Sequence, residues 1–114
     1  MKNKRLNDCI RLLDNSYRVT YYDPRMNTHN TPEHEIAKCK LIYLVKKNNE
    51  KILAECIFYN GCRCDLLIPE RFLIIEILKT ETEKEVLEKI KSYPKECEVK
   101  YYTAAEVLDK KFEY

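Results

Sequence analysis

The feature that most constrains the fold is a run of three apolar segments joined by very short connections. The segments "KILAECIFY" and "CRCDLLI" are separated by Asn60-Gly61, and the second continues through Pro69-Glu70-Arg71 into "FLIIEILK". An Asn-Gly pair between two apolar runs is the strongest short-range signal for a β-hairpin, because both residues tolerate the positive φ angles of a tight turn. The sequence therefore predicts three consecutive strands in an antiparallel meander.

Helical patterns flank this meander. Thr31 followed by Pro32 is typical of a helix start, with Thr31 as the N-cap, and the apolar period behind it runs to Asn48-Asn49. After the third strand, residues 80–93 have apolar positions at helical spacing behind a Thr cap and several acids, and Pro94 stands just past their end. One helix is therefore predicted before the meander and one after it.

The order of the elements gives the fold class. Residues 97–102 are predicted to form a fourth strand and residues 103–112 a closing helix, so the core order is helix, three strands, helix, strand, helix. The third and fourth strands are connected through a helix, and we expect them to be parallel neighbours joined by a right-handed crossover. The predicted class is α/β, with a mixed sheet flanked by helices.

The first part of the chain differs from the rest in charge. Residues 1–32 hold six Lys and Arg against three Asp, whereas residues 33–114 hold fifteen against sixteen Asp and Glu. Residues 3–14 have a helical period, residues 17–22 suggest a strand, and residues 23–30 suggest a loop. We predict a basic N-terminal arm before an α/β domain. Such an arm is compatible with a phosphate backbone as partner, although its commoner meaning is a solvated face.

Composition narrows the class further. The chain has 114 residues, of which 45% are hydrophobic and 35% charged, and this suits one compact globular domain. No apolar run approaches the roughly 18 residues of a membrane span, and no apolar stretch follows the basic N-terminus. We therefore expect a cytoplasmic protein that contacts no membrane and has no secretory signal. Its many Lys, Glu and Ile residues, with one Gly, resemble the composition of thermophile proteins.

Six cysteines are scattered through the chain, largely inside apolar stretches. Without a secretory signal, buried free thiols are favoured over disulfides. Cys62 and Cys64 have one residue between them, which is shorter than the spacing of a zinc knuckle, and no second Cys/His pair follows. A small thiol or zinc protein built on these two cysteines remains an alternative.

Charged residues inside the apolar strands are the main candidates for chemistry. Asp65 in the second strand and Glu76 in the third stand among Leu and Ile. Burying an unpaired carboxylate is costly, so such a residue is normally exposed, paired, or holding a cation. Because the two strands are adjacent, Asp65 and Glu76 could form a site for Mg²⁺ or Mn²⁺. The alternative is an exposed Asp65 and a Glu76 that is paired with Arg63 or Lys79.

The predicted hairpin suggests how the first strand aligns with the second. A two-residue Asn-Gly turn puts Cys62 opposite Tyr59, and therefore Asp65 near Cys56. Glu55 then lies about one step away, which makes it a secondary candidate for the same site.

The helix before the meander contributes three further candidates. On a helical wheel, His34 and Lys38 fall in line with Leu41 and Val45 on the buried stripe, and Glu35 lies at its edge. They are thus predicted to face the sheet at the N-terminal end of the helix. The alternative is that this end overhangs the core, which would leave these residues solvated.

The order "HEIAK" on a helix, then "GCRCD", then "FLIIEIL" resembles the restriction-endonuclease-like PD-(D/E)XK nuclease superfamily over residues 33 to about 102. The resemblance implies a core of helix, three-strand meander, helix and strand, and hydrolysis of phosphodiester bonds in DNA, with RNA not excluded. It implies that Glu35, Asp65 and Glu76 bind Mg²⁺ or Mn²⁺ and activate water. Homodimerisation is common in such folds, since cutting two strands needs two sites.

One position departs from the pattern of this family. The lysine that the family carries two residues after the Glu would fall at Leu78, which can neither orient nor deprotonate a water. A branch similar to the competence-protein CoiA group carries a helical His-x-x-x-Lys instead, as His34 and Lys38 do here. The resemblance implies that Lys38 positions the hydroxide and that His34 assists as an acid or orients a carboxylate. The alternative is an inactive nuclease-fold module that binds nucleic acid or a protein partner.

Overall fold

The computed structural model describes residues 2–13 and 28–114 of the chain. The helices are α1 (Lys2–Ile10), α2 (Pro32–Lys47), α3 (Glu83–Ser92) and α4 (Ala104–Leu108), with a short 3₁₀ helix, η1 (Pro69–Arg71). The strands are β1 (Leu53–Ile57), β2 (Arg63–Ile68), β3 (Leu73–Leu78) and β4 (Glu98–Thr103). The strand predicted at 17–22 and most of the loop predicted at 23–30 lie outside the described residues.

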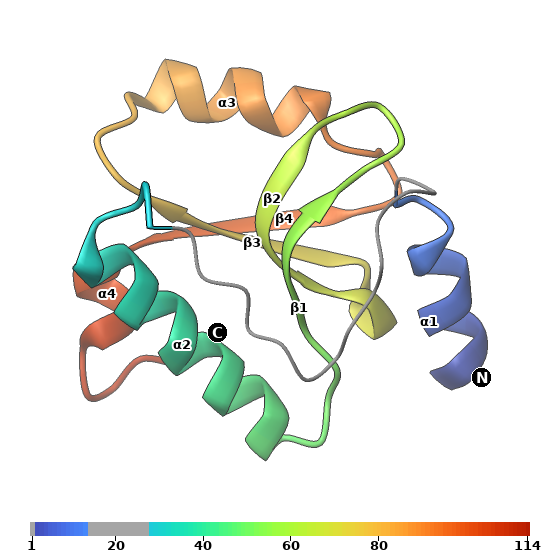
Figure 1. The fold of residues 1–114 in the computed structure, drawn as a ribbon, viewed down its shortest axis with the longest axis horizontal. Helices are drawn as coiled ribbons and strands as arrows, with labels where there is room; N and C mark the ends of the chain where they lie inside the picture. Colours follow the sequence, from blue (N-terminus) through green and yellow to red (C-terminus); the bar gives the residue numbers. More distant parts are fainter. Residues whose placement is uncertain (1, 14–27) are drawn as a thin grey trace.

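The four strands form one mixed sheet in the order β1-β2-β3-β4 (Figure 1). The pairs β1–β2 and β2–β3 are antiparallel, and β3–β4 is parallel. Both the predicted meander and the predicted parallel crossover through a helix are therefore confirmed. The fold is mixed α/β with a mixed sheet flanked by helices.

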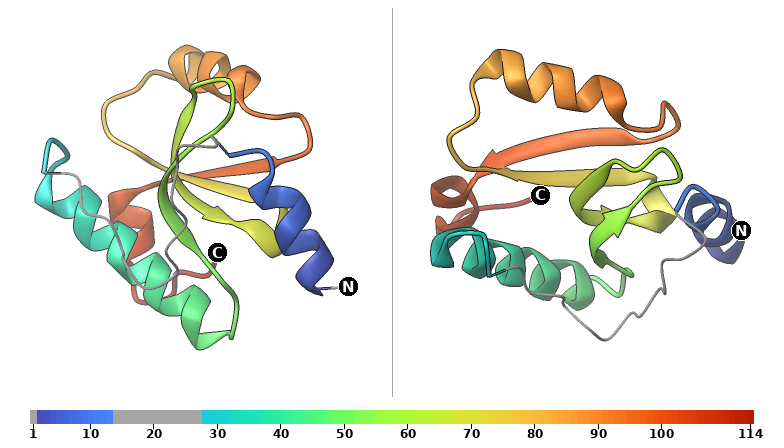
Figure 2. Two further views of the ribbon diagram at one scale, coloured as in Figure 1. Left: turned by 45° about the vertical axis from the view of Figure 1, so that its right-hand side comes forward. Right: turned by 45° about the horizontal axis from the view of Figure 1, so that its top comes forward.

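Helices cover both faces of the sheet. Figure 2 shows α3 on one side and α2 with α4 on the other. Each face has its own apolar cluster. The cluster under α2 and α4 includes Ala37, Leu41, Val45, Leu66, Ile75 and Val107. The cluster on the opposite face includes Cys9, Phe58, Cys64, Leu67, Ile74 and Tyr93.

The N-terminal helix α1 packs against η1 at the end of the sheet, and its apolar side chains join the core. Leu6, Cys9 and Leu13 are buried, and Leu13 forms an isolated antiparallel bridge with Phe58. The beginning of the predicted basic arm is therefore part of the same packed unit as the sheet.

Side-chain caps fix the start of α2. Thr31 has extended backbone and its hydroxyl accepts the His34 backbone N–H at 3.2 Å, while Pro32 takes the first helical position. This agrees with the predicted helix start. The helix ends at Lys47 with Asn48 as its C-cap, close to the predicted end. In the described part of the chain, no helix has the length and apolar character needed to cross a membrane.

The closing helix is shorter than predicted. It begins with a capping box, in which the Thr103 hydroxyl accepts the Glu106 backbone N–H and the Glu106 carboxylate accepts the Thr103 backbone N–H. It ends at Leu108 rather than at residue 112, because Asp109 has extended backbone angles (φ −64°, ψ 141°) that stop the helical hydrogen bonds.

The predicted register of the first hairpin is wrong by one residue. Its loop has three residues, Tyr59–Gly61, and Phe58 donates its N–H to the Cys62 carbonyl at 2.8 Å. Gly61 takes φ 86°, the left-handed conformation that a three-residue hairpin loop needs at its last position. Cys56 therefore pairs with Cys64. Asp65, which was predicted to lie near Cys56, is the residue that follows the partner of Cys56.

A backbone irregularity interrupts β1 at Glu55. This residue has φ 53°, an uncommon value for a residue other than Gly. Ala54 and Cys56 on either side of it should share a face by strand alternation, yet they belong to the clusters on opposite faces of the sheet. The strand therefore reverses its facing at this point.

The neighbouring strand β2 makes the same reversal at Asp65. Cys64 belongs to the cluster on the α3 face and Leu66 to the cluster under α2. The β2–β3 ladder begins at Leu66, which pairs with Ile75, and runs away from Asp65. Asp65 thus occupies the fork where these two strands stop pairing.

Candidate functional site

The fork between β2 and β3 brings the two predicted metal-binding carboxylates together. Continuing the register one step beyond Leu66 and Ile75 puts Asp65 opposite Glu76. In place of a ladder bond, the Ile77 backbone N–H donates to Oδ2 of Asp65 at 2.9 Å. The Asp65 and Glu76 carboxyl groups are close enough for each to shift the pKa of the other. The prediction that Asp65 and Glu76 lie together is confirmed.

Two carboxyl groups this close do not both ionise readily, and the environment places one proton on Glu76. Burial, reinforced by the adjacent Asp65, raises the pKa of Glu76 from 4.5 to about 9. Burial alone would also raise the pKa of Asp65. Hydrogen bonds from His34, Glu76 and the Ile77 N–H outweigh it and lower that pKa from 3.8 to about 2. At neutral pH the pair therefore holds one negative charge and one proton.

Glu76 projects toward α3, where it meets a lysine that sequence reasoning missed. Nζ of Lys89 lies 3.4 Å from Oε1 of Glu76. Oε1 is buried and has no hydrogen bond of good geometry. It borders a cavity of about 20 Å³, enough for one water molecule, which Lys89 and Tyr93 also line. Burial lowers the pKa of Lys89, but Glu76, which is ionised in the pH range where Lys89 titrates, and Asp65 outweigh it and raise that pKa above 10.5.

Lys89 could have been found from helical spacing. Together with Val86, Ile90 and Tyr93 it lines the cavity beside Glu76, and these positions follow the i, i+3, i+4, i+7 pattern of one helix face. A lysine inside such a pattern is a candidate partner for a buried acid. Neither Arg63 nor Lys79, the partners named from sequence, is the cation that the structure pairs with Glu76.

The start of α2 reaches the same fork from the other face of the sheet. His34, Glu35 and Lys38 are all buried, with exposures of 2%, 6% and 0%. Lys38 donates to Oε1 of Glu35 at 2.8 Å, and Asn30 donates to Oε2 at 3.2 Å. The prediction that these residues face the sheet is confirmed, and the alternative of a solvated helix end is wrong.

His34 links Glu35 to the fork. Its Nδ1 is 3.1 Å from Oε2 of Glu35, and its Nε2 is 3.1 Å from the Ile77 carbonyl and 3.4 Å from Oδ2 of Asp65. Every one of these partners is an acceptor, so both ring nitrogens serve as donors when His34 is a charged imidazolium. Burial lowers the pKa of His34, but Asp65 and Glu35 outweigh it and raise the pKa above 6.5.

These side chains form one polar network, called the fork network below. Its members are Lys38, Glu35, His34, Asp65, Glu76 and Lys89. It passes from the α2 face to the α3 face through the gap between β2 and β3. Solvent reaches it mainly through Asp65 and Lys89, whose side chains are 15% and 47% exposed.

Other predicted residues stay outside this network. Glu55 is buried in β1 and takes part in none of the contacts that define the fork network. Arg63 is exposed, and its backbone carbonyl accepts the Tyr93 hydroxyl at 3.0 Å. The charge of Lys79 lowers the pKa of His34, and the Lys79 backbone N–H donates to Glu81 at 2.6 Å.

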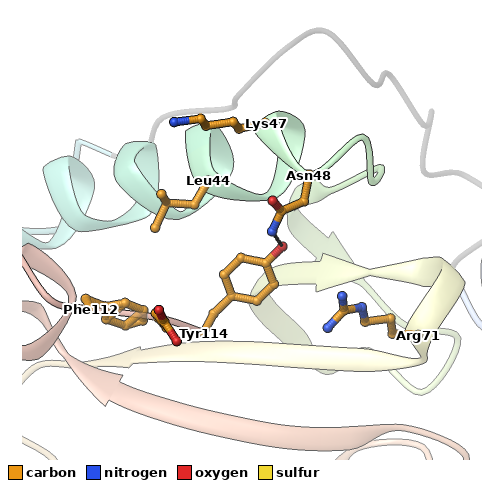
Figure 3. Close-up of a pocket in the computed structure, with 7 residues that line it drawn as sticks. Leu44, Lys47, Asn48, Arg71, Phe112 and Tyr114 are labelled. Atoms are coloured by element: carbon orange, nitrogen blue, oxygen red, sulfur yellow. Dashed lines mark hydrogen bonds between the residues drawn. The ribbon is translucent and has the colours of Figure 1, made fainter.

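The larger surface pockets do not coincide with the fork network. One, of about 390 Å³, lies between α2 and the C-terminal segment and is lined by Leu44, Arg71, Phe112 and Tyr114 among others (Figure 3). A second, of about 510 Å³, borders α4. Neither includes a residue of the network, so the network contributes nothing to the walls of either pocket.

The chain offers two carboxylates rather than a full set of protein ligands for a metal ion. Among residues 2–13 and 28–114, no three His, Cys, Asp or Glu side chains are grouped so that they could hold one. None of the six cysteines is in a disulfide, and neither Cys62 nor Cys64 forms part of such a group. Compared with protein-family models, with curated proteins and with solved structures, the chain matches none of them.

Proposed function

We propose that this chain is a metal-dependent phosphodiesterase with a restriction-endonuclease-like core, acting on DNA. The observation that carries the proposal is the contact between the Asp65 and Glu76 carboxyl groups at the open end of β2–β3. The order of elements, with a helix, an antiparallel meander, a crossover helix and a parallel strand, supports it. This is the order that the resemblance of the sequence to the PD-(D/E)XK nucleases implies.

Asp65 and Glu76 suit a hard divalent cation. Oε1 of Glu76 is a buried oxygen without a hydrogen bond, and the adjacent cavity of about 20 Å³ has the volume of one water molecule. Mg²⁺ is typically bound by one or two carboxylates and keeps several waters, so two protein carboxylates are sufficient. When bound, Mg²⁺ or Mn²⁺ would polarise the phosphate and lower the pKa of a water.

We assign to Lys89 the role of the strand lysine that the family pattern places at position 78, where this chain has Leu78. Its ammonium is 3.4 Å from Glu76, and its side chain is 47% exposed. A phosphate arriving at the fork would therefore meet this cation first. Lys89 offsets the charge that develops on the phosphate oxygens, and it holds the Glu76 oxygen in place.

Lys38, Glu35 and His34 act through Asp65. The Lys38 ammonium is fully buried and bonded to Glu35, so it cannot reach a substrate without breaking that bond. Both Glu35 oxygens are engaged, one by Lys38 and the other by Asn30 and His34. We assign these residues the positioning of His34 against Asp65, and Glu35 a contact with the cation only through water.

A second function is favoured by the closure of the site. Apart from Asp65 and Lys89, the side chains of the fork network are at most 8% exposed, and the cavity at Glu76 has a volume of only about 20 Å³. Leu78 stands where a strand lysine is expected. These features suit the alternative proposal, an inactive nuclease-fold module that binds nucleic acid or a protein partner.

Thermal unfolding with increasing Mn²⁺ tests the cation site. We expect the midpoint to rise with Mn²⁺ in the wild type, because a ligand that binds only the folded state stabilises it. Glu76→Gln should remove this response. Glu70→Gln is the matched control, since Glu70 is nearly as buried (8% against 5%) but lies in η1. An unchanged midpoint in the wild type would contradict the proposed site.

Cleavage assays separate the two functions. The wild type in Mn²⁺ is expected to cut supercoiled, linear or branched DNA, while Glu76→Gln and Lys89→Ala lose activity by at least about tenfold and Lys91→Ala does not. Lys91 is on the same helix and 75% exposed, so it controls for loss of a surface charge. Binding of DNA without cleavage would favour the inactive module. Equal cleavage by wild type and Glu76→Gln would indicate a contaminating nuclease.

A further inference from the structure

The two edge strands of the sheet, β1 and β4, differ in regularity. Each of them is next to one other strand in the described sheet. β1 is interrupted at Glu55, which has φ 53°, and such irregularities are one way in which proteins keep a sheet edge from pairing with another chain. All six residues of β4 pair with β3 without a break, and none of them is proline. β4 is therefore the edge that a further strand can extend.

The parallel ladder between β3 and β4 decides which backbone groups of β4 face the open edge. The Glu98 N–H donates to the Phe72 carbonyl at 2.8 Å, so the backbone groups of Glu98 point toward β3. The direction of these groups alternates along a strand. Val99 and Tyr101 therefore direct their N–H and C=O groups away from β3, toward the open edge.

Backbone bonds within the chain limit this edge at both ends. Before the strand, the Cys97 N–H donates to the Pro94 carbonyl at 3.0 Å. At its end, the Thr103 N–H donates to the Glu106 carboxylate of the capping box at 3.0 Å. The middle of β4 is therefore the part whose outward N–H groups can meet another strand.

The side chains of β4 give this edge a self-complementary charge pattern. Glu98 and Lys100 are two residues apart, so they lie on the same face of the sheet, and both reach solvent. Within the described part of the chain neither of them forms an ion pair. If two β4 strands pair antiparallel with Val99 opposite its own copy, Glu98 of each copy lies opposite Lys100 of the other. Opposite charges at such positions stabilise a strand pair.

The other registers that the backbone directions permit lack this match. With Val99 opposite Tyr101, Lys100 lies opposite its own copy, and like charges there destabilise the pair. With Tyr101 opposite its own copy, neither Glu98 nor Lys100 meets an opposite charge. The register centred on Val99 is therefore the one that the charges favour.

The opposite face of the same strand favours this register as well. Val99 packs against the apolar cluster on the α3 face, and Tyr101, which shares that face, is 45% exposed. With Val99 opposite its own copy, the Tyr101 ring lies diagonal to the partner's Val99, within reach of an aromatic side chain. The pairing would thus cover part of a large exposed ring.

We propose that two copies of this chain associate through their β4 strands, which pair antiparallel with Val99 at the two-fold axis and continue the four-stranded sheet from one copy into the other. The Val99 N–H of each copy donates to the Val99 carbonyl of the other, and two ion pairs between Glu98 and the partner's Lys100 flank this point. A contact of this size is smaller than a standard interface, so we expect a dissociation constant of about 10 to 100 μM.

This association does not depend on the proposed phosphodiesterase activity. No residue of the fork network belongs to β4, so a chain without catalytic activity would form the same pair. The tests below therefore measure mass and hydrogen exchange, and a failure to cleave DNA would leave their outcome unchanged.

The first test follows the full chain over a range of concentrations. Its mass, measured by light scattering, is expected to rise with concentration from the 13.7 kDa of one chain toward twice that value. Hydrogen exchange at the Val99 amide should slow in step with the fraction of dimer. The Lys100 amide, which the ladder to β3 already protects, is the internal control and should change little.

The second test reverses the charges. Lys100→Glu places like charges opposite each other in both ion pairs, and so does Glu98→Lys. We expect each change to weaken the association by at least about tenfold, and the double variant, which restores opposite charges, to recover it. Lys46→Glu, an exposed change on α2, is the control and should have no effect. The unfolding midpoint of each variant shows whether it is folded.

Three results would overturn the proposal. A single-chain mass at about 1 mM would mean that the edge does not associate. Slow exchange at the Val99 amide at every concentration would mean that the edge is occupied within one chain. A dimer that the single charge reversals leave intact, or that the double variant does not restore, would mean that another surface or another register is used.

Discussion

The two ends of the β2–β3 strand pair are built from the same strands and satisfy their backbone groups in different ways. At the end that leads to η1, Leu66 to Ile68 pair with Leu73 to Ile75 through a regular ladder, and every side chain is apolar and buried. At the other end the ladder stops, and the Asp65 side chain accepts the Ile77 N–H that a strand partner would otherwise take. The ladder end stabilises the fold through buried apolar packing, whereas the fork end presents charged groups that a ligand can contact.

The largest expected effect comes from the ladder end. Ile75 is fully buried under α2, and Ile75→Ala leaves a cavity in a well-packed cluster. We expect the free energy of unfolding to fall by about 3 to 4 kcal/mol, measured by urea denaturation. Any proposed cation response should survive, because the fork is untouched. A loss below about 1 kcal/mol would mean that this end carries less stability than its packing indicates.

The fork end should lose less on mutation of Asp65, and the loss should depend on the replacement. Asp65→Ala leaves the Ile77 N–H without its acceptor and removes the carboxylate that lies 3.4 Å from Nε2 of His34, which we expect to cost about 2 to 3 kcal/mol. Asp65→Asn keeps one acceptor oxygen and should cost less. Urea denaturation of both variants checks this difference. Equal losses would show that the hydrogen bond to Ile77 is not what holds the fork.

Glu76→Gln is expected to have the smallest effect and the opposite sign. Folded Glu76 keeps its proton to a pKa of about 9, whereas the unfolded acid loses it near 4.5. Wild-type stability therefore falls as pH rises from about 4.5 to about 9, and the amide of Gln escapes this loss. Without metal, we expect a gain on the order of 1 kcal/mol at pH 7 and none at pH 4. A variant less stable than wild type at pH 7 would contradict the protonated pair.

Sequence reasoning was most successful where one local rule applied. The helical wheel correctly predicted that His34 and Lys38 face the sheet, since both lie on the same buried stripe as Leu41. Adjacent strands brought Asp65 and Glu76 together even though the first hairpin register was wrong by one residue. The wrong register of the first hairpin does not change the position of Asp65 relative to Glu76. That position is set by the β2–β3 register, which depends on η1 rather than on the Asn-Gly loop.

The features of the fold and the site that could not be predicted from the sequence depend on tertiary contacts. The reversal of strand facing at Glu55 and Asp65 is a property of two backbones together, and alternation within one strand cannot reveal it. The pairing of Glu76 with Lys89 required knowing that α3 crosses over that part of β3.

The hydrogen bond from the Ile77 amide to Asp65 makes the exchange rate of this amide sensitive to the state of the fork. Inside a ladder an amide proton is shielded by another backbone, whereas this one is shielded by a side chain that can change partners. When a proton or a cation binds Oδ2 of Asp65, the Ile77 amide loses its acceptor and its hydrogen exchanges with solvent deuterium faster. A single resonance in a nuclear magnetic resonance spectrum would thus report the occupancy of the fork, independently of any catalytic readout.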